Sequence, residues 1–255
     1  MKKKAVFFLA GFLLWGASGA SAYTAPNSLE TPDNLNDWMS HFYLHRDTSM
    51  VVPAIREMFK QGWFQRDTAV APLAAFWASV FYQNHKKVEP WLRELDDLEF
   101  GQKKYLWMAV HLSGIPESKE LLTLIGRENG RESADYIRKL LVEKRENVVD
   151  MTISGPEVLD MFWAQFSASG DERCVRRVIG ALYYVQETDD LAKILIGGAA
   201  RWSLESNAVQ HPRVLEICKQ ARAGQPVAVR KILDEIIEKA EAELAGQAGQ
   251  AAQTA

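Results

Sequence analysis

The sequence predicts an all-α protein of about a dozen helices, and three observations lead to this fold class. Apolar residues recur at helical spacing along most of the 255-residue chain. No segment shows the strict alternation of apolar and polar residues that is typical of a half-buried strand. Short turns rich in Gly, Pro and Asn separate the helical segments. We expect irregular helical-hairpin repeats that form an α-solenoid or a compact α-bundle.

The first 22 residues resemble a cleavable signal peptide. Lys2, Lys3 and Lys4 precede an apolar run from Ala5 to Trp15, and the segment ends in the small residues Ala20-Ser21-Ala22. The apolar run has about half of the ~20 residues that a membrane-spanning helix needs. We therefore predict cleavage after Ala22, a periplasmic or secreted location, and no integral membrane segment in the mature chain.

Composition excludes some classes of partner. The formal charge of the chain is −3, and removing residues 1–22, with three lysines and no acidic residue, makes it −6. An acidic chain lacks the positive surface that binds nucleic acid. Hydrophobic residues make up 47% of the chain and include eight Trp, which suffices for the core of one large or two small domains.

A polar leader, residues 23–31, precedes an N-terminal helical half at 32–145. Pro32-Asp33-Asn34 can start the first helix, and Gly62 can end the second. The segment from Ala69 to Gln83 is almost wholly apolar, so we expect it to be buried on several sides. The expected helices cover residues 35–44, 50–61, 69–83, 88–95, 102–112, 117–125 and 133–144. Residues 145–155 are the predicted joint between the halves.

The C-terminal helical half is predicted at residues 154–244. Ser154 and Glu157 have the spacing of a capping box, and Leu159, Phe162, Trp163 and Phe166 follow at helical spacing before Gly170. Further helices are expected from Asp171 to Tyr184 and over residues 191–206, 213–221 and 226–244. The Gly-, Gln- and Ala-rich tail, 245–255, has nothing to bury and is predicted to be disordered.

A loosely repeated motif underlies the repeat prediction. In three segments an apolar residue and a Trp precede another apolar residue by three to four positions, with a Gly or Asn beyond. Their tryptophans, Trp77, Trp107 and Trp163, are 30 and 56 residues apart, and Trp202 follows 39 residues later. We interpret these aromatic residues as core residues of successive layers, with a ligand groove as the alternative.

His41 and His45 are weak candidate metal ligands. Their i, i+4 spacing places two imidazoles on one helix face, as in some zinc sites. The glutamate of a zinc protease helix is missing between them, and the sequence places no third ligand, so an ordinary pair of histidines is favoured. The acidic group Glu94, Asp96, Asp97 and Glu99 lacks the pattern of a calcium loop and is interpreted as a solvated turn. We predict no cofactor and no catalytic residue.

The polar stretch that ends the 191–206 helix is a candidate partner-binding site. Trp202, Asn207 and His211 lie within ten positions of each other. Asn207 is more often a C-terminal helix cap in such a position, and we favour that role. Gly197 and Gly198 precede them in an apolar helix, where glycine allows another helix to approach closely.

The two cysteines leave one question open. Cys174 and Cys218 each lie on an apolar-periodic helix, in a compartment that permits disulfides. The sequence does not show whether their Cα atoms come within bonding range. Two buried thiols are favoured over a disulfide.

Three functions remain open from the sequence. We favour an exported, non-enzymatic interaction scaffold that binds a protein or peptide. The alternatives are a metalloprotein or enzyme of the cell envelope that uses His41 and His45, and a secreted factor or periplasmic inhibitor of another protein. The absence of a serine elbow, a phosphate loop and a dinucleotide fingerprint favours the scaffold.

Overall fold

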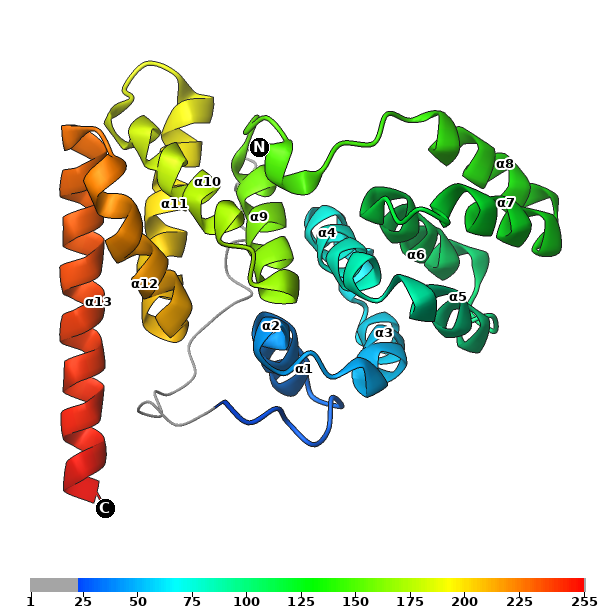
Figure 1. The fold of residues 1–255 in the computed structure, drawn as a ribbon, viewed down its shortest axis with the longest axis horizontal. Coiled ribbons are helices and arrows are strands. Elements are labelled where there is room, and N and C mark those ends of the chain that lie inside the picture. Colours follow the sequence, from blue (N-terminus) through cyan, green and yellow to red (C-terminus); the bar gives the residue numbers. More distant parts are fainter. Residues whose placement is uncertain (1–22, 255) are drawn as a thin grey trace, which may run out of the picture. The chain divides into compact units, whose positions relative to one another are not determined.

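The computed structural model describes residues 23–254, and these residues form thirteen α-helices and five short 3-10 helices without a β-strand (Figure 1). The prediction of an all-α fold is confirmed. The predicted signal peptide lies outside the described residues. Among the helices of residues 23–254, none combines the length and apolarity that crossing a bilayer requires.

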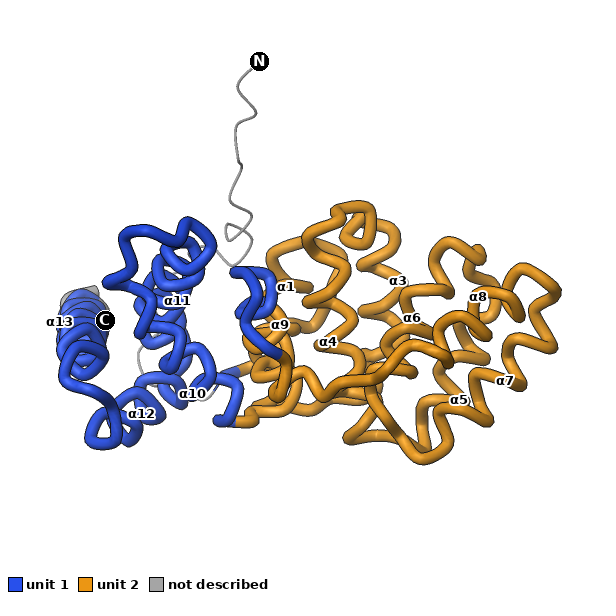
Figure 2. Tube along the Cα trace, turned by 90° about the horizontal axis from the view of Figure 1, so that it is seen from above, with its two compact units in different colours: residues 1–23, 152–160, 172–255 blue, residues 24–151, 161–171 orange. Residues whose placement is uncertain are grey.

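The chain divides into two compact units, coloured separately in Figure 2. The N-terminal unit consists of residues 24–151 and 161–171, and the C-terminal unit consists, within the described residues, of Tyr23, 152–160 and 172–254. The division after Met151 falls inside the expected joint at 145–155. The two units differ from the halves expected from the sequence in one respect. Residues 161–171 follow the expected joint but belong to the N-terminal unit.

The N-terminal unit contains most of the helices. They are α1 (Pro32–Ser40), α2 (Phe42–His45), η1 (Thr48–Met50), α3 (Val51–Lys60), η2 (Trp63–Gln65), α4 (Asp67–Gln83), α5 (His85–Glu94), α6 (Phe100–Ser113), α7 (Ser118–Glu128), α8 (Gly130–Val142), η3 (Val148–Asp150) and the second half of α9 (Pro156–Ser169).

Local capping explains where two of these helices begin and end. The Thr31 hydroxyl accepts a hydrogen bond from the Asn34 backbone N–H at 3.2 Å and so caps α1, with Pro32 in its first turn. At α6, Glu99 and Gln102 form a capping box. Gly114, with a φ of 63°, ends α6 in the left-handed conformation that glycine adopts readily.

The core of this unit is built from aromatic side chains around α4. Phe76 and Trp77 are fully buried, with ring centroids 5.0 Å apart, and Trp38 of α1 lies 6.4 Å from Trp77. Trp107 of α6 is also buried and packs 5.9 Å from Phe100. The apolar sequence of α4 therefore corresponds to burial on several sides, as expected.

The end of α9 belongs to the N-terminal unit because it packs on α2 and α4. The Phe166 ring lies 5.0 Å from Tyr43, and Gln83 donates from its amide to the Ala168 carbonyl at 3.1 Å. Arg46 donates to the Ser169 carbonyl at 3.3 Å. These contacts join residues more than 80 positions apart, which periodicity along the chain does not reveal.

The C-terminal unit contains the start of α9, α10 (Glu172–Ala181), η4 (Leu182–Gln186), α11 (Leu191–Gln210), α12 (Pro212–Ala221), η5 (Arg222–Gly224) and α13 (Val227–Thr254). Its core is aliphatic rather than aromatic. Val178, Leu204, Ile217 and Leu233, one from each of α10 to α13, are fully buried. Cys174 and Cys218 are buried in α10 and α12 as separate thiols, and burial raises the pKa of the Cys218 thiol to about 12.

The last helix is longer than expected. α13 continues through Thr254, whereas the sequence predicted a disordered tail at 245–255. The side chains of residues 245–250 are mostly exposed, so burial does not explain the extension. Ala and Gln are good helix formers, and adding a turn to an existing helix carries no nucleation cost. The intrinsic helix propensity of the tail, rather than burial, therefore accounts for the longer helix.

Candidate functional site

The structure does not arrange His41 and His45 as a pair of metal ligands. α1 ends at Ser40, and His41 separates it from α2. The Nδ1 atom of His45 accepts a hydrogen bond from the Asp47 backbone N–H at 3.1 Å, so Nε2 carries the proton and donates to the Trp38 carbonyl at 3.1 Å. Burial lowers the pKa of His45. Within residues 23–254, no three metal-ligating side chains gather into a group.

The residues predicted to bind a partner do not share a surface. Trp202 is 43% exposed, whereas His211 is 2% exposed. Asn207 lies inside α11, which continues to Gln210, so His211 takes the C-cap position that we expected for Asn207. The Asn207 amide donates to the Ser203 carbonyl at 2.8 Å, one turn back along the helix. Of these three residues, only Trp202 has an exposed apolar side chain.

The acidic group between α5 and α6 does not form a cation site either. Asp97 accepts two hydrogen bonds from the Arg56 guanidinium, at 2.7 and 2.9 Å, and this contact lowers the pKa of Asp97. Asp96 accepts from Lys103 at 2.7 Å. The two neighbouring carboxylates therefore pair with different basic side chains, Asp97 with Arg56 and Asp96 with Lys103.

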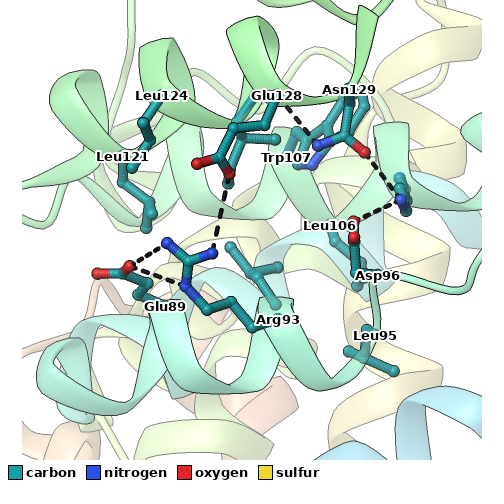
Figure 3. Close-up of a pocket in the computed structure, with 13 residues that line it drawn as sticks. Glu89, Arg93, Leu95, Asp96, Leu106, Trp107, Leu121, Leu124, Glu128 and Asn129 are labelled. Carbon is teal, nitrogen blue, oxygen red and sulfur yellow. Dashed lines mark hydrogen bonds and ion pairs between the residues drawn. The ribbon is translucent and has the colours of Figure 1, made fainter.

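A pocket in the N-terminal unit is the candidate site that the sequence analysis missed. It lies between α5, α6 and α7 and has a volume of about 200 Å³ (Figure 3). Seven of its lining residues are apolar, five are charged and one is an asparagine. These residues are Leu92, Leu95, Leu106, Trp107, Leu121, Leu124 and Ile125, then Glu89, Arg93, Asp96, Lys103 and Glu128, and Asn129.

Helical periodicity places the apolar lining. Leu106 and Trp107 on α6 are 1% and 2% exposed and form the floor. Leu121, Leu124 and Ile125 have i, i+3, i+4 spacing, so they share one face of α7. Leu121 and Ile125 are buried, but Leu124 is 39% exposed and lies where the pocket opens. The buried Leu106 and Trp107 together with the exposed Leu124 make this an apolar depression with an accessible edge.

Ion pairs surround the opening. Figure 3 shows Arg93 between the carboxylates of Glu89 and Glu128. Arg93 donates to Glu89 Oε1 from Nη2 at 2.8 Å and from Nε at 3.0 Å, and this hydrogen bonding raises the pKa of Arg93. The Arg93 Nη1 atom lies 3.8 Å from Glu128 Oε2, so a looser ion pair joins α5 to α7. A single arginine thus connects both sides of the pocket.

Lys103 of α6 bonds to residues that follow α5 and α7. Its ammonium donates to Asp96 Oδ1 at 2.7 Å and to Asn129 Oδ1 at 2.8 Å. The Lys103 side chain is 14% exposed, much less than that of Arg93, at 57%. The lining residues include no histidine, cysteine or serine. The apolar part of the lining has the means to bind an apolar group.

The sequence contained part of the signal for this pocket. The apolar face of α7 is visible as periodicity, and the sequence analysis placed Trp107 in the core, where it lies. The meeting of α5 with α7 over α6 is a tertiary contact and has no sequence motif. No protein-family model, curated protein or solved structure matches this chain. The assignment of function therefore rests on the geometry of the pocket and on the sequence itself.

Proposed function

We propose that this chain is an exported, non-enzymatic α-helical scaffold that binds a partner protein through the pocket of α5, α6 and α7. The observation that carries the proposal is the depression floored by Leu106 and Trp107 with Leu124 exposed at its edge. Small-molecule pockets usually measure about 300–1,000 Å³. A pocket of about 200 Å³ is better suited to one side chain of a partner, which is how protein interfaces place their anchors.

The proposal includes a layered arrangement of helices. In the N-terminal unit α6 packs on α7 and α8, and α7 packs on α8. In the C-terminal unit α11 packs on α10, α12 and α13. Packing between successive helices is what stacked hairpins require, and such stacks commonly present binding surfaces between neighbouring helices. The signal-like residues 1–22 support export, which would place the binding surface in the periplasm or outside the cell.

Site-specific photo-crosslinking tests the proposal. The photoreactive residue p-benzoylphenylalanine replaces Leu124 in the full chain, expressed in the source organism and irradiated in intact cells. We expect one discrete adduct, identified by mass spectrometry. The matched control carries the same residue at Val142, which is 82% exposed at the end of α8 in the same unit. No adduct at position 124, both in these cells and after the protein is added to other cells, or the same adducts at positions 124 and 142, would contradict binding at the pocket.

The same experiment addresses the secreted-factor alternative. A scaffold that remains in its own envelope gives an adduct with a protein of the same cells. A secreted factor or inhibitor would use the same pocket but give the adduct only after the protein is added to other cells. No observation in the structure favours the metalloprotein alternative, because both ring nitrogens of His45 are engaged in hydrogen bonds.

A further inference from the structure

We infer that the occupant of the pocket is an apolar side chain of the partner that has a positively charged Lys or Arg beside it. The inference rests on the proposed function, since it specifies the occupant of the same pocket. Two features carry it. They are the balance of charge around the lining and the distribution of unused hydrogen-bond acceptors.

The charge of the lining is negative. Three carboxylates, Glu89, Asp96 and Glu128, face two basic groups, Arg93 and Lys103, so one negative charge is in excess. Both basic groups already have carboxylate partners, Arg93 with Glu89 and Lys103 with Asp96. An anionic occupant would compete with these partners and would meet like charge, which costs binding free energy.

The unused hydrogen-bonding capacity consists of acceptors. Glu89 bonds Arg93 through Oε1, and Asp96 bonds Lys103 through Oδ1, which leaves the second oxygen of each without a hydrogen bond among the described residues. Glu128 has only the contact at 3.8 Å, which is longer than a hydrogen bond. A carboxylate accepts several hydrogen bonds, so an occupant with N–H donors would fill capacity that is now unused.

Glu128 is the carboxylate best placed to receive the cation. It follows Leu124 by four residues on α7, so both side chains lie on the same helix face at the pocket opening. The Glu128 side chain is 49% exposed, and Arg93 is held more closely by Glu89 than by Glu128. A group that enters past Leu124 therefore meets Glu128, and a cation on that group would replace or supplement Arg93 there.

Three small molecules of matched shape test the inference on the mature chain. They are 3-phenylpropylamine, 3-phenylpropan-1-ol and 3-phenylpropanoate, which share a ring and chain and differ in charge at neutral pH. Molecules of this size bind with dissociation constants of about 1–10 mM, so an NMR titration that follows the indole N–H signal of Trp107 is suitable. We expect the amine to bind most tightly and the carboxylate least tightly.

A pair of α7 variants locates the charge preference. Glu128→Gln should weaken binding of the amine about two- to fivefold, which is the range for exposed ion pairs, and leave the alcohol unchanged. The control Glu120→Gln removes the same charge from an exposed position of α7 that does not line the pocket, and it should leave both affinities unchanged. An equal loss in both variants would mean that net charge acts without a specific contact, and the inference would be wrong.

The outcomes separate the inference from the proposed function. If all three molecules bind with equal affinity, or if the carboxylate binds most tightly, the inference is overturned while the apolar pocket remains a binding site. If none of them changes the Trp107 signal at concentrations of about 10 mM, no apolar group enters the pocket, and the proposed function falls as well.

Discussion

Two adjacent glycines of α11 should respond in opposite directions to the same substitution. An ideal Cβ atom at Gly197 would lie 2.5 Å from the Tyr184 carbonyl carbon and 2.6 Å from the Val185 nitrogen, both in the backbone of η4. At Gly198 no heavy atom beyond the adjacent residues and the nearby backbone of α11 lies within 4 Å of such a Cβ. The glycine pair was predicted to permit a close approach of another helix, and in the structure only Gly197 has that role.

The expected magnitudes follow from two opposing effects. Ala is more favourable than Gly inside a helix by about 1 kcal/mol, so Gly198→Ala should stabilise the chain by about 0.5–1 kcal/mol. Gly197→Ala gains the same propensity, but its methyl group lies about 1 Å too close to backbone atoms that cannot rotate away. Overpacking of this kind costs about 1–3 kcal/mol or more, which leaves a net destabilisation of about 1–2 kcal/mol.

Urea unfolding of residues 23–255, followed by far-UV circular dichroism, measures both effects. The two variants should differ by about 1.5–3 kcal/mol in free energy of unfolding, with unchanged dependence on denaturant. Each variant is the control for the other, because both replace Gly by Ala in neighbouring positions of one helix. Stabilisation by both substitutions would refute the close contact between α11 and η4, and destabilisation by both would refute the open surface at Gly198.

Three further predictions concern other parts of the chain. Burial and repulsion from Glu157 raise the pKa of Asp160 to about 7, so the protonated carboxyl contributes stability that is fully present below pH 3.8 and is lost as the pH rises through 7. Asp160→Asn should therefore increase the free energy of unfolding at pH 8, by up to about 4 kcal/mol, and should have a smaller effect at pH 5. Urea unfolding at the two pH values measures the difference. The folded protein at pH 8 should resist iodoacetamide, because Cys174 and Cys218 are buried, and unfolding without reductant should expose two thiols by mass spectrometry. The mature protein should begin at Tyr23, as N-terminal sequencing will show, and an intact Met1 would contradict export by cleavage.

The sequence predicted the helices well because their signals are local. Pro32, expected to start the first helix, lies in the first turn of α1, and Gly62, expected to end the second, follows α3 in the left-handed conformation. Helix ends were less predictable where two local signals compete. Asn207 resembles a C-cap, but α11 continues to Gln210, and the proline that begins α12 follows His211. A proline at the first position of the next helix fixed the boundary more strongly than the asparagine.

The candidate site was less predictable because it depends on contacts between helices. His41 and His45 have the spacing of ligands on one continuous helix, but the chain breaks that helix at His41. The pocket lining comes from three helices separated by short turns, and each contributes residues that look like ordinary core or surface positions. Trp107 illustrates the difficulty, since the same burial that makes it a core residue makes it the floor of a pocket.

The two basic groups of the pocket differ in how firmly they are held, and this difference determines where a cationic ligand would act. Lys103 is 14% exposed and makes two hydrogen bonds, to Asp96 and Asn129, so removing either partner would leave a nearly buried ammonium poorly satisfied. The contact of Arg93 with Glu128 is long and exposed to solvent, and ion pairs of that kind contribute little to stability. A ligand cation would therefore replace Arg93 at Glu128 at small cost, while Arg93 keeps its two hydrogen bonds to Glu89. The selectivity of the pocket for charge should accordingly depend on Glu128, and Lys103 should act mainly to hold α6 and the end of α7 together.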